Sequence, residues 1–250
     1  GNNDEYLADL GASIGTAGIY YYASRFQLDE QAFVYGGFQG GFWDGNNNIS
    51  GTLTVNPPPF KTLTISVLLE GLYNSSGQMN QANGEAGPQF GSGIADEITV
   101  ELHNENDYSI TEQSFAGVAL GTDGSATVSV PANFSGNYYL TVRHRNSIET
   151  TSSAAVSFSN QSILCDFSQP ANVYGNNLLQ MSDGWFVIFG GDVNQDGVID
   201  TGDVTPLDND QFNYLTGYVA TDANGDGSVD TGDITIVDNN QFNYVASITP

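Results

Sequence analysis

DVNQDGVIDTGD at residues 192–203 and DANGDGSVDTGD at residues 222–233 are two copies of one pattern, offset by thirty residues. Each copy continues as DNxQFNY, so the repeat extends well beyond twelve positions. An internal repeat of this length indicates a duplicated structural unit rather than two unrelated loops. The alternative, that Asp and Asn serve only as turn formers on a solvated surface, does not account for two twelve-residue stretches in register.

Side chains that carry oxygen occupy positions 1, 3, 5, 9 and 12 of each copy. Ca²⁺ prefers six to eight hard oxygen ligands, and a tight loop of alternating short carboxylates directs them to one point. Glycine at position 6, Gly197 or Gly227, allows the sharp turn, and position 7 contributes its backbone carbonyl. The sequence therefore predicts two Ca²⁺ sites. The expected ligands are Asp192, Asn194, Asp196, Val198, Asp200 and Asp203 in the first loop, and Asp222, Asn224, Asp226, Ser228, Asp230 and Asp233 in the second.

Position 12 is Asp in both copies, where a calmodulin-type loop has Glu. This Asp, the paired repeat and a helix that starts on the last residues of the loop make residues 191–248 resemble a type I dockerin, an EF-hand-like module. The resemblance implies that each loop runs directly into a helix, over residues 203–215 and 233–245, with Pro206 tolerated in a first turn. We expect Ile199 and Val229, at position 8, to pair as a short ribbon between the loops. Phe212, Tyr214, Phe242 and Tyr244 are expected to form the core between the helices.

The resemblance also implies a partner, because dockerins attach secreted polysaccharide-degrading enzymes to cohesins. The positions that select the cohesin are Thr201-Gly202 and Thr231-Gly232 here, and glycine offers no side chain for recognition. The module therefore also fits a calcium-stabilised terminus or a unit that packs on the neighbouring domain. Its eleven Asp, with no Lys, Arg or Glu in residues 191–250, predict that calcium binding is coupled to folding.

Residues 1–190 are expected to be all-β, because short alternating strands are separated by Gly and Asn turns. The stretches 124–131 and 136–142 resemble immunoglobulin-like modules of secreted bacterial surface proteins. Asn56-Pro57-Pro58-Pro59 marks a domain boundary. The sequence thus predicts a mainly β protein with three parts: a partial immunoglobulin-like unit (1–56), a β-sandwich domain (57–190) with a long mobile loop at 79–93, and the dockerin-like helical module (191–250). The expected strands cover residues 19–28, 32–35, 51–55, 63–69, 97–103, 126–130, 137–145 and 163–167.

Composition limits the partners. Four basic residues against 29 acidic ones give a net charge of -25, which repels nucleic acid and anionic membranes. There is no apolar run long enough to span a bilayer, and the single cysteine, Cys165, is expected in a core strand. Cysteine poverty alone would fit the cytosol, but richness in Asn, Gly, Ser and Thr with a single lysine is typical of an extracellular or cell-surface protein of bacterial type. The missing leader and the incomplete first unit suggest a piece of a larger protein.

No catalytic constellation is evident. His103 and His144 stand beside no nucleophile motif and in no metal-ligand spacing. Arg143 and Arg145 are expected on one strand face, paired with acidic neighbours such as Glu97, Glu101 or Glu149, with His144 on the other face. The chain is therefore expected not to be an enzyme.

The favoured hypothesis is a non-catalytic calcium-binding region acting in attachment or extracellular assembly, with a protein partner or self-association. One alternative is a filament or sheath subunit built by strand sharing. The other is a carbohydrate-binding accessory region of a polysaccharide-degrading enzyme, in which aromatic rings stack on a glycan. Its rings are Tyr20, Tyr21, Tyr22, Phe26, Phe33, Tyr35, Phe38, Phe42 and Trp43.

Overall fold

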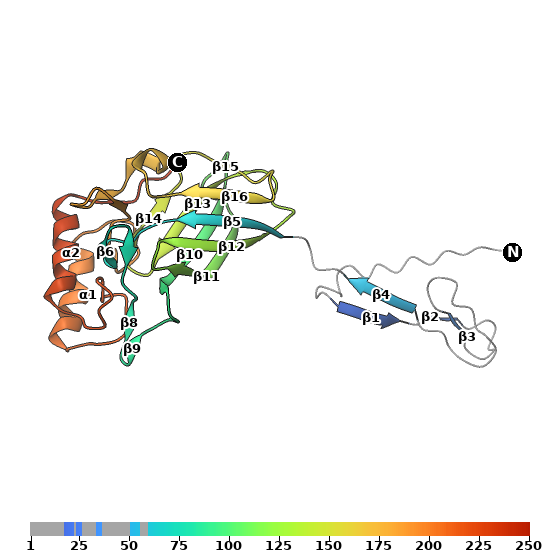
Figure 1. Ribbon diagram of the computed structural model, residues 1–250, viewed down its shortest axis with the longest axis horizontal. Helices are drawn as coiled ribbons and strands as arrows, with labels where there is room; N and C mark the ends of the chain where they lie inside the picture. Colours follow the sequence, from blue (N-terminus) through green and yellow to red (C-terminus); the bar gives the residue numbers. More distant parts are fainter. Residues whose placement is uncertain (1–17, 23, 27–33, 37–50, 56–59) are drawn as a thin grey trace. The chain divides into compact units, whose positions relative to one another are not determined.

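The computed structural model describes the backbone of residues 18–22, 24–26, 34–36 and 51–55, and all of residues 60–250. The chain divides into two compact units, Gly1–Pro59 and Phe60–Pro250 (Figure 1). In the first unit, β1 (Gly18–Tyr22) pairs antiparallel with β4 (Gly51–Val55), and β2 (Ser24–Phe26) with β3 (Val34–Gly36). The side chains of the predicted aromatic cluster lie outside the described residues, so glycan stacking there stays a prediction.

The second unit is built on an eight-stranded sheet in the order β14-β13-β10-β11-β12-β5-β16, with β15 added beside β13. Neighbours are antiparallel except β16, which runs parallel to β5. The hydrogen bonds therefore link these strands into one sheet, where two separate sheets were expected. The strands are β5 (Phe60–Ser66), β10 (Ile94–Asn104), β11 (Thr111–Gly121), β12 (Ser125–Pro131), β13 (Asn137–His144), β14 (Ser147–Thr151), β15 (Val156–Ser157) and β16 (Ser162–Asp166).

Alternating residues of these strands build the core. Buried and exposed positions alternate along β5, β12 and β16, as expected for strands with one covered face. Ile148 on β14 and Ile163 on β16, at opposite ends of the strand order, belong to one hydrophobic cluster, so the sheet curls around a shared core. Cys165 is buried in that cluster, as its strand predicted.

Two of the longer strands of the large sheet, β11 and β14, have no counterpart in the sequence-based prediction. Most side chains of β11 are exposed or half-buried, so its sequence lacks the apolar alternation that marks a half-buried strand. In β14 the buried positions include Ser147, Thr150 and Thr151, which alternation of apolar residues does not reveal.

The predicted loop at residues 79–93 carries short ladders. The small elements of the unit pair as β6 (Tyr73–Ser75) with β7 (Gln78–Met79), β8 (Asn83–Gly84) with β9 (Gly87–Pro88), and β17 (Leu179–Gln180) with β18 (Phe186–Val187). Two short 3₁₀ helices cover Pro170–Asn172 and Tyr174–Asn176. The β8–β9 segment donates a backbone hydrogen bond from Asn83 to Gly225, so it packs on the second repeat.

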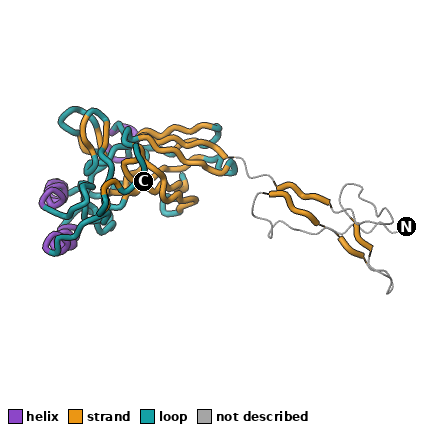
Figure 2. Tube along the Cα trace, turned by 60° about the horizontal axis from the view of Figure 1, so that its bottom comes forward, coloured by secondary structure: helices purple, strands orange, loops and turns teal. Residues whose placement is uncertain are grey.

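Two α-helices complete the unit, α1 (Thr201–Phe212) and α2 (Thr231–Phe242). They contact each other and lie together at one end of the unit, beyond the large sheet, in both views (Figures 1 and 2). Residues 191–250 thus share one compact unit with residues 60–190. Neither helix is long and apolar enough to cross a membrane, and the described residues contain no other α-helix.

Lys61, the only lysine of the chain, occupies an inward position of β5 and is 7% exposed. Its Nζ donates to the carbonyl oxygens of Phe134 (2.9 Å) and Phe158. The ammonium group therefore satisfies two carbonyls at the margin of the core.

Replacing this lysine by methionine keeps most of its volume but removes the donor. We expect Lys61→Met to lower the free energy of unfolding by about 1–3 kcal/mol, because two carbonyls lose their partner. Urea denaturation measures the change, with Ser129→Ala at an exposed position of β12 as a control expected within about 0.5 kcal/mol of the parent. Equal stability of the Lys61→Met protein and the parent would contradict this role.

Candidate functional site

Each predicted loop leads into its helix through a reciprocal capping box. Asp200 caps α1 by accepting a hydrogen bond from the Gly202 N–H (2.6 Å), and Asp203 Oδ2 accepts from the Asp200 N–H (2.9 Å). Asp230 and Asp233 do the same at α2. Positions 9 and 12 of the loops are therefore also the N-cap and N3 residues of the helices. For this reason the helices begin two residues earlier than predicted.

Positions 1, 3 and 5 shape the loops by short side-chain to backbone bonds. In the first loop, Asn194 Oδ1 accepts from the Asp196 N–H (2.8 Å) and Asp196 Oδ1 from the Val198 N–H (3.0 Å). Asn224 and Asp226 repeat these bonds in the second loop. Position 12 closes each loop, since Asp203 Oδ1 accepts from Asn194 N–H (3.1 Å) and Asp233 Oδ1 from Asn224 N–H (2.9 Å). The five predicted side chains of each copy thus belong to one hydrogen-bonded loop.

Four of these carboxylates are buried: Asp192 (2% exposed) and Asp203, Asp222 and Asp233 (each 0%). Burial, followed by repulsion from Asp203, raises the pKa of Asp192 to about 6. Burial raises the pKa of Asp222 to about 6 as well, although the charge of Arg145 acts in the opposite direction. The pKa values of Asp203 and Asp233 are also raised, chiefly by burial. Close, buried negative charges of this kind are stabilised by a cation.

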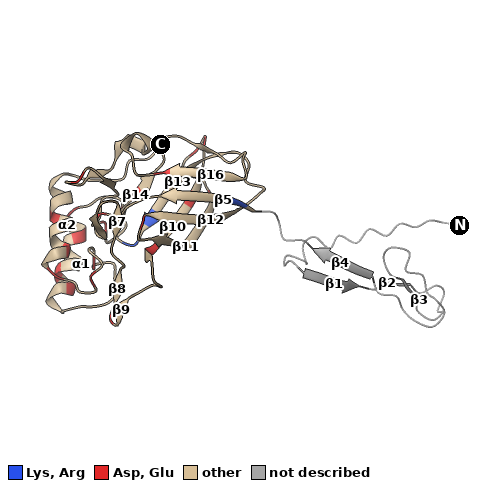
Figure 3. Cartoon of the chain, viewed as in Figure 1, with Lys and Arg blue, Asp and Glu red and all other residues tan. Residues whose placement is uncertain are grey.

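Within residues 60–250, none of the four buried carboxylates forms a salt bridge with a basic side chain. Asp192 Oδ1 is buried and has no hydrogen-bond partner among the described residues. An unpaired buried carboxylate oxygen is costly, and a bound cation would satisfy it. Figure 3 shows acidic residues and no basic ones on the two helices.

The described residues contain no group of three or more His, Cys, Asp or Glu side chains placed to hold a metal ion. A site in these loops therefore needs the asparagine amide at position 3 and the backbone carbonyl at position 7 as well as carboxylates. Those are the donor types that Ca²⁺ accepts. The two ligand sets stay predictions.

The expected ribbon between Ile199 and Val229 is not formed. Instead, the Ile199 N–H donates to Val245 O (2.9 Å), and the Val229 N–H donates to Leu215 O (3.0 Å). Each loop therefore pairs with the chain that leaves the helix of the other repeat. The two repeats exchange equivalent contacts, because residues 199 and 229, and 215 and 245, differ by the repeat offset of thirty.

The expected aromatic core is also wrong. Phe212, Tyr214, Phe242 and Tyr244 are 83%, 88%, 84% and 91% exposed. The buried apolar residues of the repeats are smaller: Val193, Ile199, Leu207, Val229, Val237 and Val245. The helices end at Phe212 and Phe242, three residues before the predicted ends, so the Phe and Tyr of each QFNY motif project at a helix terminus rather than between helices.

Arg143 forms the predicted acidic contacts, with Glu101 (Nε to Oε2, 2.9 Å) and with Glu149. His103 is buried and lies 3.1 Å from Glu101 Oε2. His144 and Arg145 differ from the prediction of opposite strand faces, because β13 ends at His144 and Arg145 lies in the turn that follows.

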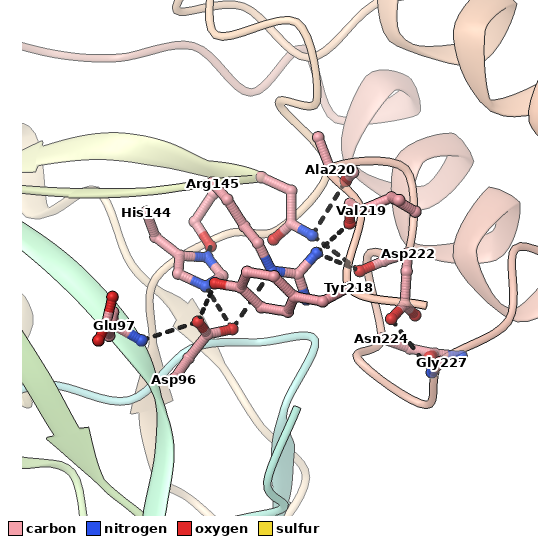
Figure 4. A network of polar contacts seen from close by, with 12 residues as sticks. Asp96, Glu97, His144, Arg145, Tyr218, Val219, Ala220, Asp222, Asn224 and Gly227 are labelled. Carbon is pink, nitrogen blue, oxygen red and sulfur yellow. Dashed lines mark hydrogen bonds and ion pairs between the residues drawn. The ribbon is translucent and has the colours of Figure 1, made fainter. Parts of the chain in front are cut away.

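Both His144 and Arg145 reach the fully buried Asp96 (Figure 4). His144 Nε2 and Arg145 Nε lie 3.0 and 3.3 Å from Asp96 Oδ2, and Tyr218 donates its hydroxyl to Asp96 Oδ1. Burial acts to raise the pKa of Asp96, but His144, Arg145 and Tyr218 together lower it to about 2. Burial holds the pKa of His144 below its usual range.

Sequence reasoning missed the contacts that Arg145 and Asn146 make with the second loop. The Arg145 guanidinium donates to Val219 O and, at 2.8 Å, to Asp222 O. Asn146 Nδ2 donates to Ala220 O (3.1 Å) and Asp222 O (2.9 Å). These contacts span more than seventy residues of chain, so no local spacing could reveal them.

Comparison with known proteins gives little. No family model matches the chain, and no curated protein matches it. Among solved structures, the chain is similar to chains of two mutant type II cohesin–X-dockerin complexes from Acetivibrio cellulolyticus. For the C-terminal interface mutant, the match has 16% identity and a TM-score of 0.42, and it covers 74% of this chain and 99% of the other. For the N-terminal interface mutant, the identity is 17%, the TM-score 0.43, and the coverage the same. Likeness at this level assigns neither a family nor a function.

The raised pKa of Asp192 predicts how the calcium-free protein responds to pH. Its folded pKa of about 6 exceeds the ordinary aspartate value of 3.8, so the folded state is stabilised by protonation below about pH 4 and loses that stability as the pH rises through 6. We therefore expect calcium-free wild type to become less stable relative to Asp192→Asn between pH 4.5 and about 7. The opposite contribution of His144 is present in both proteins and cancels.

Urea denaturation of calcium-stripped protein at several pH values measures this difference. Saturating calcium should reverse the sign at pH 7, because the charged carboxylate is then paired. A stability difference independent of pH would contradict the burial of an unpaired charge at Asp192.

Proposed function

We propose that this chain is a calcium-dependent docking region of an extracellular protein. In this proposal, residues 191–250 bind two Ca²⁺ ions, and the ions hold the loops that start both helices. The C-terminal ends of the helices then offer a protein partner two equivalent aromatic patches, Phe212 with Tyr214 and Phe242 with Tyr244. The role is attachment or assembly rather than catalysis.

The calcium part rests on the buried carboxylates. The Asp192 Oδ1 atom without a partner is the observation that carries it, because a bound hard cation would satisfy this buried oxygen. The bonds made by positions 3, 5, 9 and 12 recur at equivalent positions of the second loop, where Asp222 is also buried. When bound, Ca²⁺ would supply the positive charge that residues 191–250, with no Lys or Arg, do not contain.

The docking part rests on the backbone as well as on exposure. Tyr214 and Tyr244 have φ values of 53° and 57°, in the left-handed region where a residue following a helix is usually Gly or Asn. A bulky side chain at such a position destabilises the fold by about 1–2 kcal/mol. Because these rings are exposed, burial of apolar surface offsets little of this strain. Strain that recurs at equivalent positions is typical of a functional surface.

The surroundings of the patches indicate the partner's chemistry. Phe242 and Tyr244 border a groove of about 700 Å³ that also includes Val198, Ile199 and Asp238. Exposed carboxylates at Asp208 and Asp238 lie on the same helices. A protein surface with an apolar centre and a basic or polar rim fits this arrangement.

The two alternatives depend on other parts of the chain. Glycan stacking by the aromatic cluster and strand sharing by the first unit both involve residues 1–56, whose side chains are not described. Both stay predictions.

Calcium titration tests the first part. We expect calorimetry of the intact chain to find two bound ions. Asp192→Ala and Asp222→Ala should each weaken one site by at least about 100-fold, since even outer contacts of a metal site contribute 10–100-fold. Unchanged calcium affinity in both variants would overturn the ligand assignment.

Replacement of both tyrosines by glycine separates docking from folding. Relief of the left-handed strain, less the entropy of glycine, should stabilise Tyr214→Gly and Tyr244→Gly by about 0.5–1 kcal/mol each. Asn213→Gly, at a φ of -88°, is the matched control and should not stabilise. Thermal denaturation with saturating calcium measures all three.

The double tyrosine variant should lose binding at the same time. The resemblance to dockerins implies cohesin modules as the probe, tested as a purified panel with calcium and with chelator. We expect calcium-dependent binding that falls on the order of 30-fold or more in the double variant, because interface aromatics contribute about 2 kcal/mol. Binding that is equal in the variant, or equal without calcium, would contradict the proposal. Calcium-dependent growth in size without cohesin binding would instead favour self-assembly.

A further inference from the structure

The two loops have almost the same sequence but different surroundings. Position 4 is Gln195 in the first loop, where it is exposed, and Gly225 in the second, where it is buried. Both residues have a positive φ, 60° and 71°. A Cβ at Gly225 would lie 2.3 Å from Leu72 Cδ2, so a larger residue would force the buried Leu72 side chain to move, and the second loop packs closely on the β region (residues 60–190).

The β region also approaches the backbone of the second loop elsewhere. A Cβ at Gly71 would lie 1.8 Å from Ala223 O, so only glycine fits there. Asn83 donates from its N–H to Gly225 O (2.9 Å) and from Nδ2 to Asp226 O (3.3 Å). The second loop is therefore held from one side by residues 71–83.

The β13–β14 turn, Arg145-Asn146, holds the other side. Between them, Arg145 and Asn146 donate to the carbonyls of Val219, Ala220 and Asp222. Asp222 is position 1 of the loop, and its carbonyl receives both donors. Figure 4 shows the guanidinium directed at this backbone.

A guanidinium beside a cation-binding loop would normally repel the cation. Here Asp96 is paired with Arg145 and is fully buried, so the pair is close to neutral. The Arg145 side chain also lies over the Tyr218 ring, with 4.5 Å from Cζ to the centroid. Arg145 is thus fixed in place while its charge is compensated.

The first loop has fewer such contacts. Gln195 Nε2 donates to Ser147 O (3.3 Å) and to Asp192 O, and the Gly191 N–H donates to Asn146 O (2.7 Å) just before the loop. Asp192 Oδ1 lacks a partner, whereas both oxygens of Asp222 accept N–H bonds, from Asp226 and Gly227.

We propose that Arg145 and Asn146 are positioning residues for the second calcium loop, which they hold in its binding conformation, so that this loop binds Ca²⁺ more tightly than the first. Through the same contacts, Ca²⁺ bound in the second loop would stabilise the packing of residues 191–250 on the β region. This inference rests on the proposed calcium binding. A preordered loop loses less conformational entropy when the ion binds, and the coupling between ion and turn is reciprocal.

Calorimetric titration of the intact chain with CaCl₂ tests the inference. We expect two unequal sites, of which Asp222→Ala abolishes the tighter and Asp192→Ala the weaker. Asn146→Ala removes two donors to the second loop and should weaken the tighter site about tenfold, at roughly fivefold or less for each hydrogen bond. Gln195→Ala removes the matching side-chain contact of the first loop and should leave the tighter site unchanged.

Arg145→Lys provides a second variant that keeps the ion pair with Asp96 but cannot span two carbonyls. It should also weaken only the tighter site. Amide hydrogen exchange measures whether the effect extends beyond the loop. Calcium should protect the amides of residues 141–151 in the parent and in Asp192→Ala, but not in Asp222→Ala.

Two equal sites, or an Asn146→Ala protein in which both sites or neither weaken, would overturn the inference while leaving calcium binding intact. Absence of calcium binding to the parent chain would instead show that the proposed function itself fails.

Discussion

Burial of four carboxylates that form no salt bridge within residues 60–250 is the constraint on which residues 191–250 depend. Asp203 and Asp233 close their loops and at the same time complete the capping boxes that start α1 and α2. The groups that would hold a cation are therefore the groups that begin the helices. In the proposed function, neutralising their charge and forming the helices would therefore be one event, and calcium would act on the folding of the module.

The curled sheet supplies what the repeats lack. With Leu207 and Val237 as the fully buried apolar side chains of the helices, the two repeats alone enclose a small apolar core. The β region adds the Arg145-Asn146 turn and the close approach at Gly71 and Gly225. These contacts fall on one loop only. The duplicated sequence thus forms an asymmetric structure. The second loop is held by contacts with the β region, and the first loop is more exposed to solvent.

The tyrosines of the QFNY motifs strain the backbone without stabilising the fold. An exposed tyrosine in the left-handed region of each repeat strains the backbone and buries little apolar surface. A sequence optimised for folding alone would carry glycine at both positions. That the same choice recurs at both helix ends is the physical reason to regard these ends as contact surfaces, and the acidic helices around them restrict the partners to surfaces that are not themselves acidic.

The sequence by itself determined the features that follow from local spacing. Alternation gave most core strands, and the positions of Asp, Asn and Gly defined the loops and the helix starts within two residues, because turns and caps are formed by side chains a few positions apart. It did not determine β11 or β14, whose polar residues show no alternation. Only the tertiary structure decided that Phe212 and Tyr214 face solvent, that Ile199 pairs with Val245 rather than Val229, and that Arg145 reaches Asp222. Each of these depends on which distant segment lies alongside, and a contact between residues far apart in the chain leaves no period in the sequence.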